Sequence, residues 1–150
     1  MNRINVLAVS AAMFLVSLSP LAAKDPAKFQ IPKGTRVLLC DFKVGGLDKL
    51  TPSVTLVMTD KAGKITAYDG LIAASNLSTL PVTILTENDK RITYGWTVPG
   101  FADDRNQYVP ATKVRLTVQN GDLSAMITMM PLGYRNENAR GTCRTGVIDK

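Results

Sequence analysis

The stretch Lys113-Val-Arg-Leu-Thr-Val-Gln-Asn-Gly-Asp-Leu-Ser-Ala-Met-Ile-Thr-Met-Met130 decides the class of fold. Its first half alternates Val114, Leu116 and Val118 with polar residues, and a second alternating run follows Asn120-Gly121. A period of two places the apolar side chains on one face of a β-strand. Asn-Gly between two such runs is a strong signal for a two-residue type I′ hairpin turn. The stretch therefore predicts an antiparallel hairpin with one buried face.

The rest of the chain repeats this pattern of short strands and turn residues. Turn signals occur at Asp60-Lys-Ala-Gly63 and Glu87-Asn-Asp-Lys90. The predicted strands span 35–42, 53–59, 64–68, 82–86, 91–98, 113–119, 123–130 and 141–145. About eight antiparallel strands in sequence order form a meander, which at this length must curl or split into two packed sheets.

The two cysteines favour a closed barrel over an open sheet. Cys40 lies on the first predicted strand and Cys143 on the last, and a disulfide between them makes these strands neighbours. We therefore expect an all-β fold, a small up-and-down barrel of lipocalin- or streptavidin-like architecture, with a β-sandwich as the alternative. Tyr94 and Trp96 lie on one face of their predicted strand, which favours a filled interior.

The first 23 residues have the layout of a secretory signal peptide. Arg3 gives a positive start, an apolar run follows, and small residues end at Ala23. The later sequence contains no apolar run long enough for a spanning helix. We expect cleavage near Ala23, a polar lead-in at 24–34, a single β-domain at 35–150, and a periplasmic or secreted location.

Composition restricts the possible chemistry. Without Arg3 the chain keeps 17 basic and 12 acidic side chains, a scattered net charge of +5. The 6% of aromatic residues form no basic and aromatic stripe, which argues against nucleic acid as a partner. The chain has no histidine, so histidine-based catalytic triads and metal sites are excluded. We expect no metal and no cofactor.

The longest polar connection, Pro99–Pro110, is the first candidate binding loop. It holds the charged residues Asp103, Asp104 and Arg105 between two aromatic residues, Phe101 and Tyr108. Long loops are often functional, although a solvated crossover is the alternative interpretation. Tyr134 and Arg135, in the polar loop before the last strand, are further candidates, because such pairs recognise anionic or aromatic groups.

Two apolar features fall outside this loop. Val57, Leu85, Met126 and Met130 fall on faces predicted to point outward. They indicate a partner surface or a homodimer, with two alternatives: a sandwich whose second side is also covered, and single surface apolar residues of the ordinary kind. The insertion Leu71–Leu80 is apolar and contains the best helix candidate, Leu71 to Leu77. We expect it to plug one end of the barrel, with a lid over a ligand as the alternative.

Three motifs in the C-terminal third carry a resemblance. Trp96-Thr-Val-Pro-Gly100, Gly133-Tyr-Arg-Asn136 and Gly141-Thr-Cys143 resemble an uncharacterised family of small exported β-proteins of alphaproteobacteria. This resemblance implies a periplasmic setting and no particular activity. In size and disulfide layout the chain is also similar to small periplasmic inhibitors of lysozyme, but it lacks their Ser-Gly-x-x-Tyr loop.

These observations favour an exported, non-enzymatic β-barrel that binds an envelope protein or a small ligand. The alternatives are a periplasmic lysozyme-type hydrolase inhibitor and a lipocalin-like carrier, which differ in whether the barrel interior is filled or hollow. An enzyme without histidine would need paired carboxylates. Asp41 is the strand residue to examine for that role.

Overall fold

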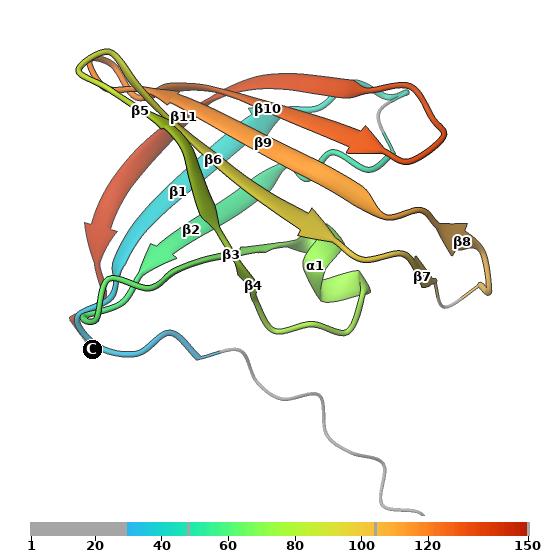
Figure 1. Ribbon diagram of the computed structural model, residues 1–150, viewed down its shortest axis with the longest axis horizontal. Coiled ribbons are helices and arrows are strands. Elements are labelled where there is room, and N and C mark those ends of the chain that lie inside the picture. The colour runs from blue at the N-terminus through green and yellow to red at the C-terminus, as the bar shows by residue number, and fades with distance from the viewer. Residues whose placement is uncertain (1–29, 48, 104, 150) are drawn as a thin grey trace, which may run out of the picture.

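The computed structural model describes residues 30–149 apart from Asp48 and Asp104, and shows an all-β protein (Figure 1). Its elements are β1 (Arg36–Lys43), β2 (Val54–Thr59), β3 (Ile65–Asp69), α1 (Gly70–Ala74), β4 (Leu80–Pro81), β5 (Thr83–Glu87), β6 (Arg91–Val98), β7 (Phe101–Ala102), β8 (Tyr108–Val109), β9 (Thr112–Gln119), β10 (Ser124–Pro131) and β11 (Glu137–Val147). All eight predicted strands are present, and the last is much longer than expected.

The strands form a nearly closed antiparallel barrel. Nine of them follow the order β4-β3-β2-β1-β11-β10-β9-β6-β5, while β7 and β8 form a separate hairpin. The one unsealed seam lies between β4 and β5. These two strands are consecutive pieces of one segment: β4 pairs with β3, the Val82 amide donates to the Ile65 carbonyl at 3.0 Å, and β5 pairs with β6. The predicted up-and-down barrel is confirmed.

The first and last strands pair along their whole length. Eight residue pairs join β1 to β11, from Arg36 opposite Val147 to Lys43 opposite Arg140. Cys40 faces Cys143 in this register, and their sulfur atoms form a disulfide of 2.06 Å. Gly141 lies opposite Phe42, and a Cβ atom there would collide with the Asp41 carbonyl. The glycine therefore lets β1 and β11 approach closely beside the disulfide.

The inward faces of the strands supply the core. Val114, Leu116 and Val118 on β9 are at most 2% exposed, as the alternation predicts. Ile127 and Met129 on β10 are fully buried opposite them. Val57 is a correction to the predicted outward face: it is 3% exposed and faces inward, because it pairs with Leu38 and Ala67 on strands whose same face forms the core. Leu85 and Met126 are exposed as predicted, and Met130 is half-buried.

Helix α1 closes one end of the barrel, which we call the plugged end. Leu71 and Ile72 are buried in the core cluster, so the predicted plug is confirmed. Asp69 begins the helix, with Oδ1 accepting from the amides of Leu71 and Ile72 at 2.9 Å each. Burial raises the pKa of the Asp69 carboxyl, and these two hydrogen bonds oppose that effect only in part.

The hairpin between β9 and β10 differs from the expected two-residue turn. Val118 pairs with Ala125, which leaves a four-residue loop at 120–123, and Leu123 has the positive φ of 55°. The side chain of Asn120 donates to the carbonyls of Asn88 and Asp89 at 2.8 and 3.1 Å, so the loop is tied to the neighbouring hairpin. Relative to a two-residue turn, the pairing of β9 with β10 is therefore shifted by two residues. The same side chains stay buried, because side chains on a strand return to the same face every two residues.

We predict that the double variant Cys40→Ala/Cys143→Ala unfolds at a lower denaturant concentration than the wild type. The disulfide closes a loop with a sequence separation of 103, and removing it releases chain entropy worth about 4–5 kcal/mol in the entropic model. Urea unfolding followed by tryptophan fluorescence measures the difference in the free energy of unfolding. An unchanged midpoint would contradict this role for the disulfide.

Candidate functional site

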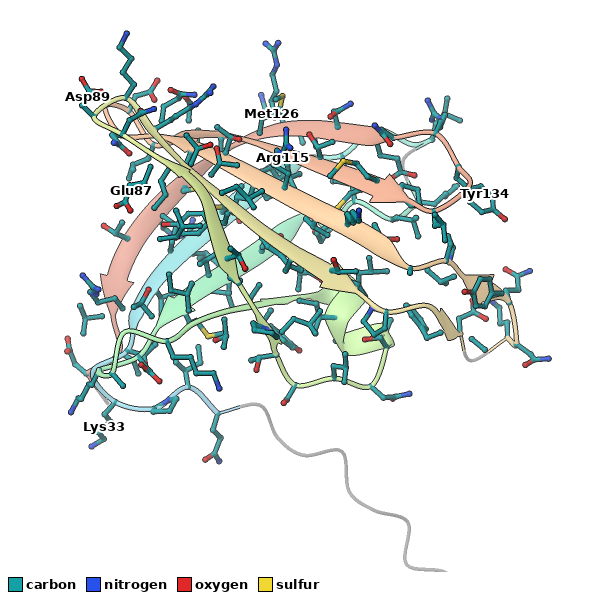
Figure 2. All side chains as sticks on the ribbon, in the orientation of Figure 1. Lys33, Glu87, Asp89, Arg115, Met126 and Tyr134 are labelled. Atoms are coloured by element: carbon teal, nitrogen blue, oxygen red, sulfur yellow. A yellow bond between two sulfur atoms is a disulfide. The ribbon has the colours of Figure 1, made fainter. Side chains whose placement is uncertain are left out.

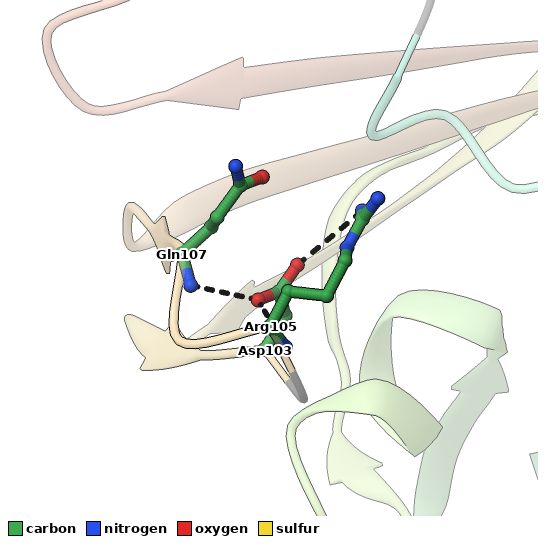
Figure 3. A network of polar contacts seen from close by, with 3 residues as sticks. All are labelled: Asp103, Arg105 and Gln107. Carbon is green, nitrogen blue, oxygen red and sulfur yellow. Dashed lines mark hydrogen bonds and ion pairs between the residues drawn. The ribbon is translucent and has the colours of Figure 1, made fainter.

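The predicted binding loop is a small hairpin whose charges stabilise its own turn (Figure 3). Asp103 Oδ1 accepts from the amides of Gln107 and Arg105 at 2.7 and 3.0 Å, and Asp103 Oδ2 lies 3.5 Å from Arg105. The hydrogen bond from Gln107 and the contacts with Arg105 hold the pKa of Asp103 below its usual value. Asp103 therefore serves the hairpin as a turn acceptor, and Asp104 lies outside the described residues.

The two aromatic residues of this hairpin have different surroundings. Phe101 on β7 is half-buried and packs against the core cluster. Tyr108 on β8 is 71% exposed, with its ring over Gly100, where a Cβ atom would come within 2.5 Å of the tyrosine hydroxyl. Phe101 thus anchors the hairpin to the barrel, while Tyr108 is presented to solvent.

Tyr108, Tyr134 and Arg135 line one surface cleft of about 460 Å³. Tyr134 follows β10 and is 69% exposed, so the cleft has an exposed tyrosine from each of two distant loops. Leu50, Pro110 and Pro131 supply apolar wall. We call this hollow the tyrosine cleft. Of the seven predicted site residues, the structure brings these three together, and Phe101, Asp103 and Arg105 do not line the cleft.

Glu137 fixes one wall of the tyrosine cleft. Its Oε2 accepts from the amides of Leu50 and Thr51 at 3.0 Å and from the Thr51 hydroxyl at 2.9 Å, and its Oε1 accepts from the Lys49 amide at 3.1 Å. Burial acts to raise the pKa of this carboxyl, but the hydrogen bonds outweigh it, so the pKa lies below its usual value. A charged Glu137 therefore holds the segment before β2 against the start of β11.

A second hollow lies inside the barrel, at the end opposite α1. This open end holds a cavity of about 600 Å³ with walls from β1, β2, β3, β5, β6 and β11, which we call the cup. Its apolar lining consists mainly of Leu38, Val57, Ile65, Ile84 and Ile92. The expected filled interior thus holds for the plugged half of the barrel, and the other half is hollow.

Three polar side chains converge on the cup. Tyr94 is half-buried, and its pKa is raised by burial and by the negative charge of Glu87, with Arg36 acting in the opposite direction. Among the described residues, no hydrogen bond joins the Tyr94 hydroxyl to a partner, and no ion pair involves Arg36 or Glu87. In Figure 2, Glu87 and Tyr134 lie at opposite ends of the barrel, so the cup and the tyrosine cleft are separate.

The cup was not predicted from the sequence. Tyr94 was expected, with Trp96, to fill the barrel interior, whereas it lines the open end with Arg36 and Glu87. Arg36 is the first residue of β1 and Glu87 is the last residue of β5. At the end of a strand, the alternation of apolar and polar residues gives little indication of whether a side chain points into the barrel or outward. Only the closure of the barrel brings these strand ends together.

The described residues contain no group of three or more His, Cys, Asp or Glu side chains placed to hold a metal ion. Among the same residues, no helix has the length and apolar character needed to cross a membrane. Comparison with protein-family models, curated proteins and solved structures gave no match.

We predict that Glu137→Gln lowers the free energy of unfolding at neutral pH by about 1–3 kcal/mol, because charged acceptors make the stronger hydrogen bonds. The folded-state pKa of Glu137 is depressed, so its contribution is present at neutral pH and is lost as the pH falls through that pKa. The difference between variant and wild type should therefore shrink as the pH falls from neutral to below the ordinary glutamate pKa of about 4.3.

Urea unfolding across this pH range measures the effect. Glu87→Gln is the matched control, since no described group donates a hydrogen bond to the Glu87 carboxylate. A Glu137→Gln difference that stays constant with pH would contradict the proposed charged state.

Proposed function

We propose that the protein is an exported, non-enzymatic β-barrel binding module that carries a small amphipathic molecule in its cup. The observation that supports this proposal is that only half of the barrel interior is filled. Helix α1 closes one end with Leu71 and Ile72, while about 600 Å³ remains accessible at the other. A cavity of this size is in the range of small-molecule sites, which are concave and mostly apolar.

The cup lining supports the class of ligand. Its aliphatic wall suits an apolar ring or chain, which gains by leaving water. Arg36, Glu87 and the Tyr94 hydroxyl suit a polar head with both hydrogen-bond donors and acceptors. A ligand with an apolar body and a polar head at the rim satisfies both parts of the lining.

The carboxylates support binding over catalysis, because Glu87 is the single acidic side chain among the described residues of the cup lining and a histidine-free enzyme would need a pair. Asp69 caps α1, Glu137 holds the segment before β2, and Asp103 stabilises its own turn. Asp41 lies on the outer face, where its carboxylate pairs with Arg144 at 2.7 Å. None of these four carboxylates lines the cup. The disulfide supports export, because such bonds persist in oxidising compartments.

The proposal is tested with 8-anilinonaphthalene-1-sulfonate, a fluorescent probe with an aromatic body and an anionic head. We expect one saturable site on the wild type. Ile84 is 38% exposed and lines the cup, so Ile84→Trp should fill it and abolish this binding without disturbing the core. Val54→Trp is the matched control, because Val54 is 42% exposed on β2 and lies outside the cup.

Circular dichroism establishes that both tryptophan variants are folded. Probe binding by Ile84→Trp equal to that of the wild type would place the site elsewhere and overturn the carrier proposal.

A second candidate function rests on the tyrosine cleft. Tyr108 and Tyr134 are 71% and 69% exposed above the filled, plugged half of the barrel. A filled body with exposed aromatic side chains on loops suits recognition of another protein, since tyrosine is enriched at binding hot spots. We propose a hydrolase of the envelope, of the lysozyme class, as the partner in this case.

The second candidate predicts that the wild type slows lysis of peptidoglycan by a lysozyme of low net charge, which limits repulsion by this basic protein. Tyr108→Ala/Tyr134→Ala should weaken inhibition by about tenfold or more. Leu132→Ala is the control, because Leu132 is 75% exposed beside the cleft without lining it. Equal inhibition by both variants, or no inhibition by the wild type, would exclude this candidate.

A further inference from the structure

The outer face of β6, β9, β10 and β11 has an unusual distribution of charge. Its outward positions carry five basic side chains and no acidic one, and the basic residues are Arg91, Lys113, Arg115, Arg140 and Arg144. Arg144 is paired with Asp41 on the neighbouring strand. In the part of the chain that the structure describes, the other four make no ion pair.

Three of these arginines line one hollow. Arg91, Arg115 and Arg140 border a groove of about 710 Å³ on this face, which we call the arginine groove. Figure 2 shows Arg115 and Met126 above the same outer side of the sheet. Leu85 forms one wall, because it lies over Gly95, where a Cβ atom would come within 2.7 Å of its side chain. The groove is therefore part of the outer surface and separate from the cup.

The lining of the arginine groove between the arginines is rich in hydroxyl groups. The hydroxyls of Thr93 and Thr117 are 3.1 Å apart, and the Thr128 hydroxyl donates to Asn138 at 2.8 Å. Thr93 is only 5% exposed although its side chain is on the outer face. Threonine hydroxyls and the nearby Gln119 amide both donate and accept hydrogen bonds, as sugar hydroxyls do.

The strand register sets the spacing of the positive charges. Arg140 on β11 lies opposite Met126 on β10, and Arg115 on β9 lies opposite Thr128 on β10. The two arginines are therefore separated by two strand spacings across the sheet and by two residues along it. This corresponds to about 12 Å between their Cα atoms. The three groove arginines are distributed over a face four strands wide, from β6 to β11, which suits a ligand with several carboxylates along a chain better than one small anion. Guanidinium groups bind carboxylates through paired hydrogen bonds, which favours such a ligand.

We propose that the arginine groove binds a strand of acidic polysaccharide, with Arg91, Arg115 and Arg140 on its carboxylates and the threonine hydroxyls on its sugars. The groove lining contains no aromatic side chain on which a nucleic-acid base would stack. Its concave shape suits a chain better than the plane of a lipid bilayer. The observations therefore favour the polysaccharide over these other polyanions.

The test uses the full mature chain with its disulfide and a fluorescently labelled hexamer of galacturonic acid. We expect saturable binding at low ionic strength that weakens as salt screens the charges. Arg115→Gln/Arg140→Gln should weaken it by about tenfold or more. Lys33→Gln/Lys64→Gln removes the same charge at exposed positions outside the groove and should leave the affinity within about twofold of the wild type.

Three results would overturn the proposal. The first is absence of hexamer binding by the wild type, and the second is equal weakening by the two double variants, which would indicate nonspecific charge attraction. The third is tighter binding to phosphatidylglycerol vesicles or to a single-stranded oligonucleotide than to the hexamer, with the same loss in Arg115→Gln/Arg140→Gln. That result would assign the groove to a lipid surface or a nucleic acid instead.

Discussion

The pairing of β1 with β11, fixed by the Cys40–Cys143 disulfide, is the constraint on which the other features depend. It joins strands from the two ends of the domain, so the meander between them must curve into a barrel. Gly141 permits the close approach of the two backbones in the same region. Because the ends of the meander are joined here, the remaining seam falls in the middle of the sequence, where the segment containing β4 and β5 changes partner from β3 to β6.

This closure gives the barrel two different ends. At the plugged end, the side chains of α1 pack into the core cluster with the fully buried Leu116, Ile127 and Met129, and the loops carry the exposed tyrosines outside. At the open end the same inward faces continue past the core and line the cup. A barrel with a filled half and a hollow half is thus compatible with both interpretations that the sequence left open, a carrier and an inhibitor.

Features set by local alternation could be predicted from the sequence, whereas features set by contacts between residues distant in the chain could not. Alternation in 91–98 and 113–119 correctly gave strand extent and facing, because burial on one side forces a period of two. The inward position of Val57 was missed, since Val57 and its neighbours Leu56 and Met58 are all apolar and give no alternation. The type of turn at 120–123 was also missed, because Asn120 is used to hold a neighbouring hairpin that is distant in sequence. Of the predicted site, only Tyr108, Tyr134 and Arg135 share one surface cleft.

The sequence by itself determined the strand pattern, the expected pairing of its two cysteines and the absence of histidine chemistry, since these follow from local period and composition. Only the tertiary structure decided which side chains meet. Arg36, Glu87 and Tyr94 come from β1, β5 and β6, and Arg91, Arg115 and Arg140 come from β6, β9 and β11. Their convergence depends on strand register and on closure of the barrel. Both are fixed by contacts between residues far apart in the chain, and no local sequence pattern indicates which of these residues meet.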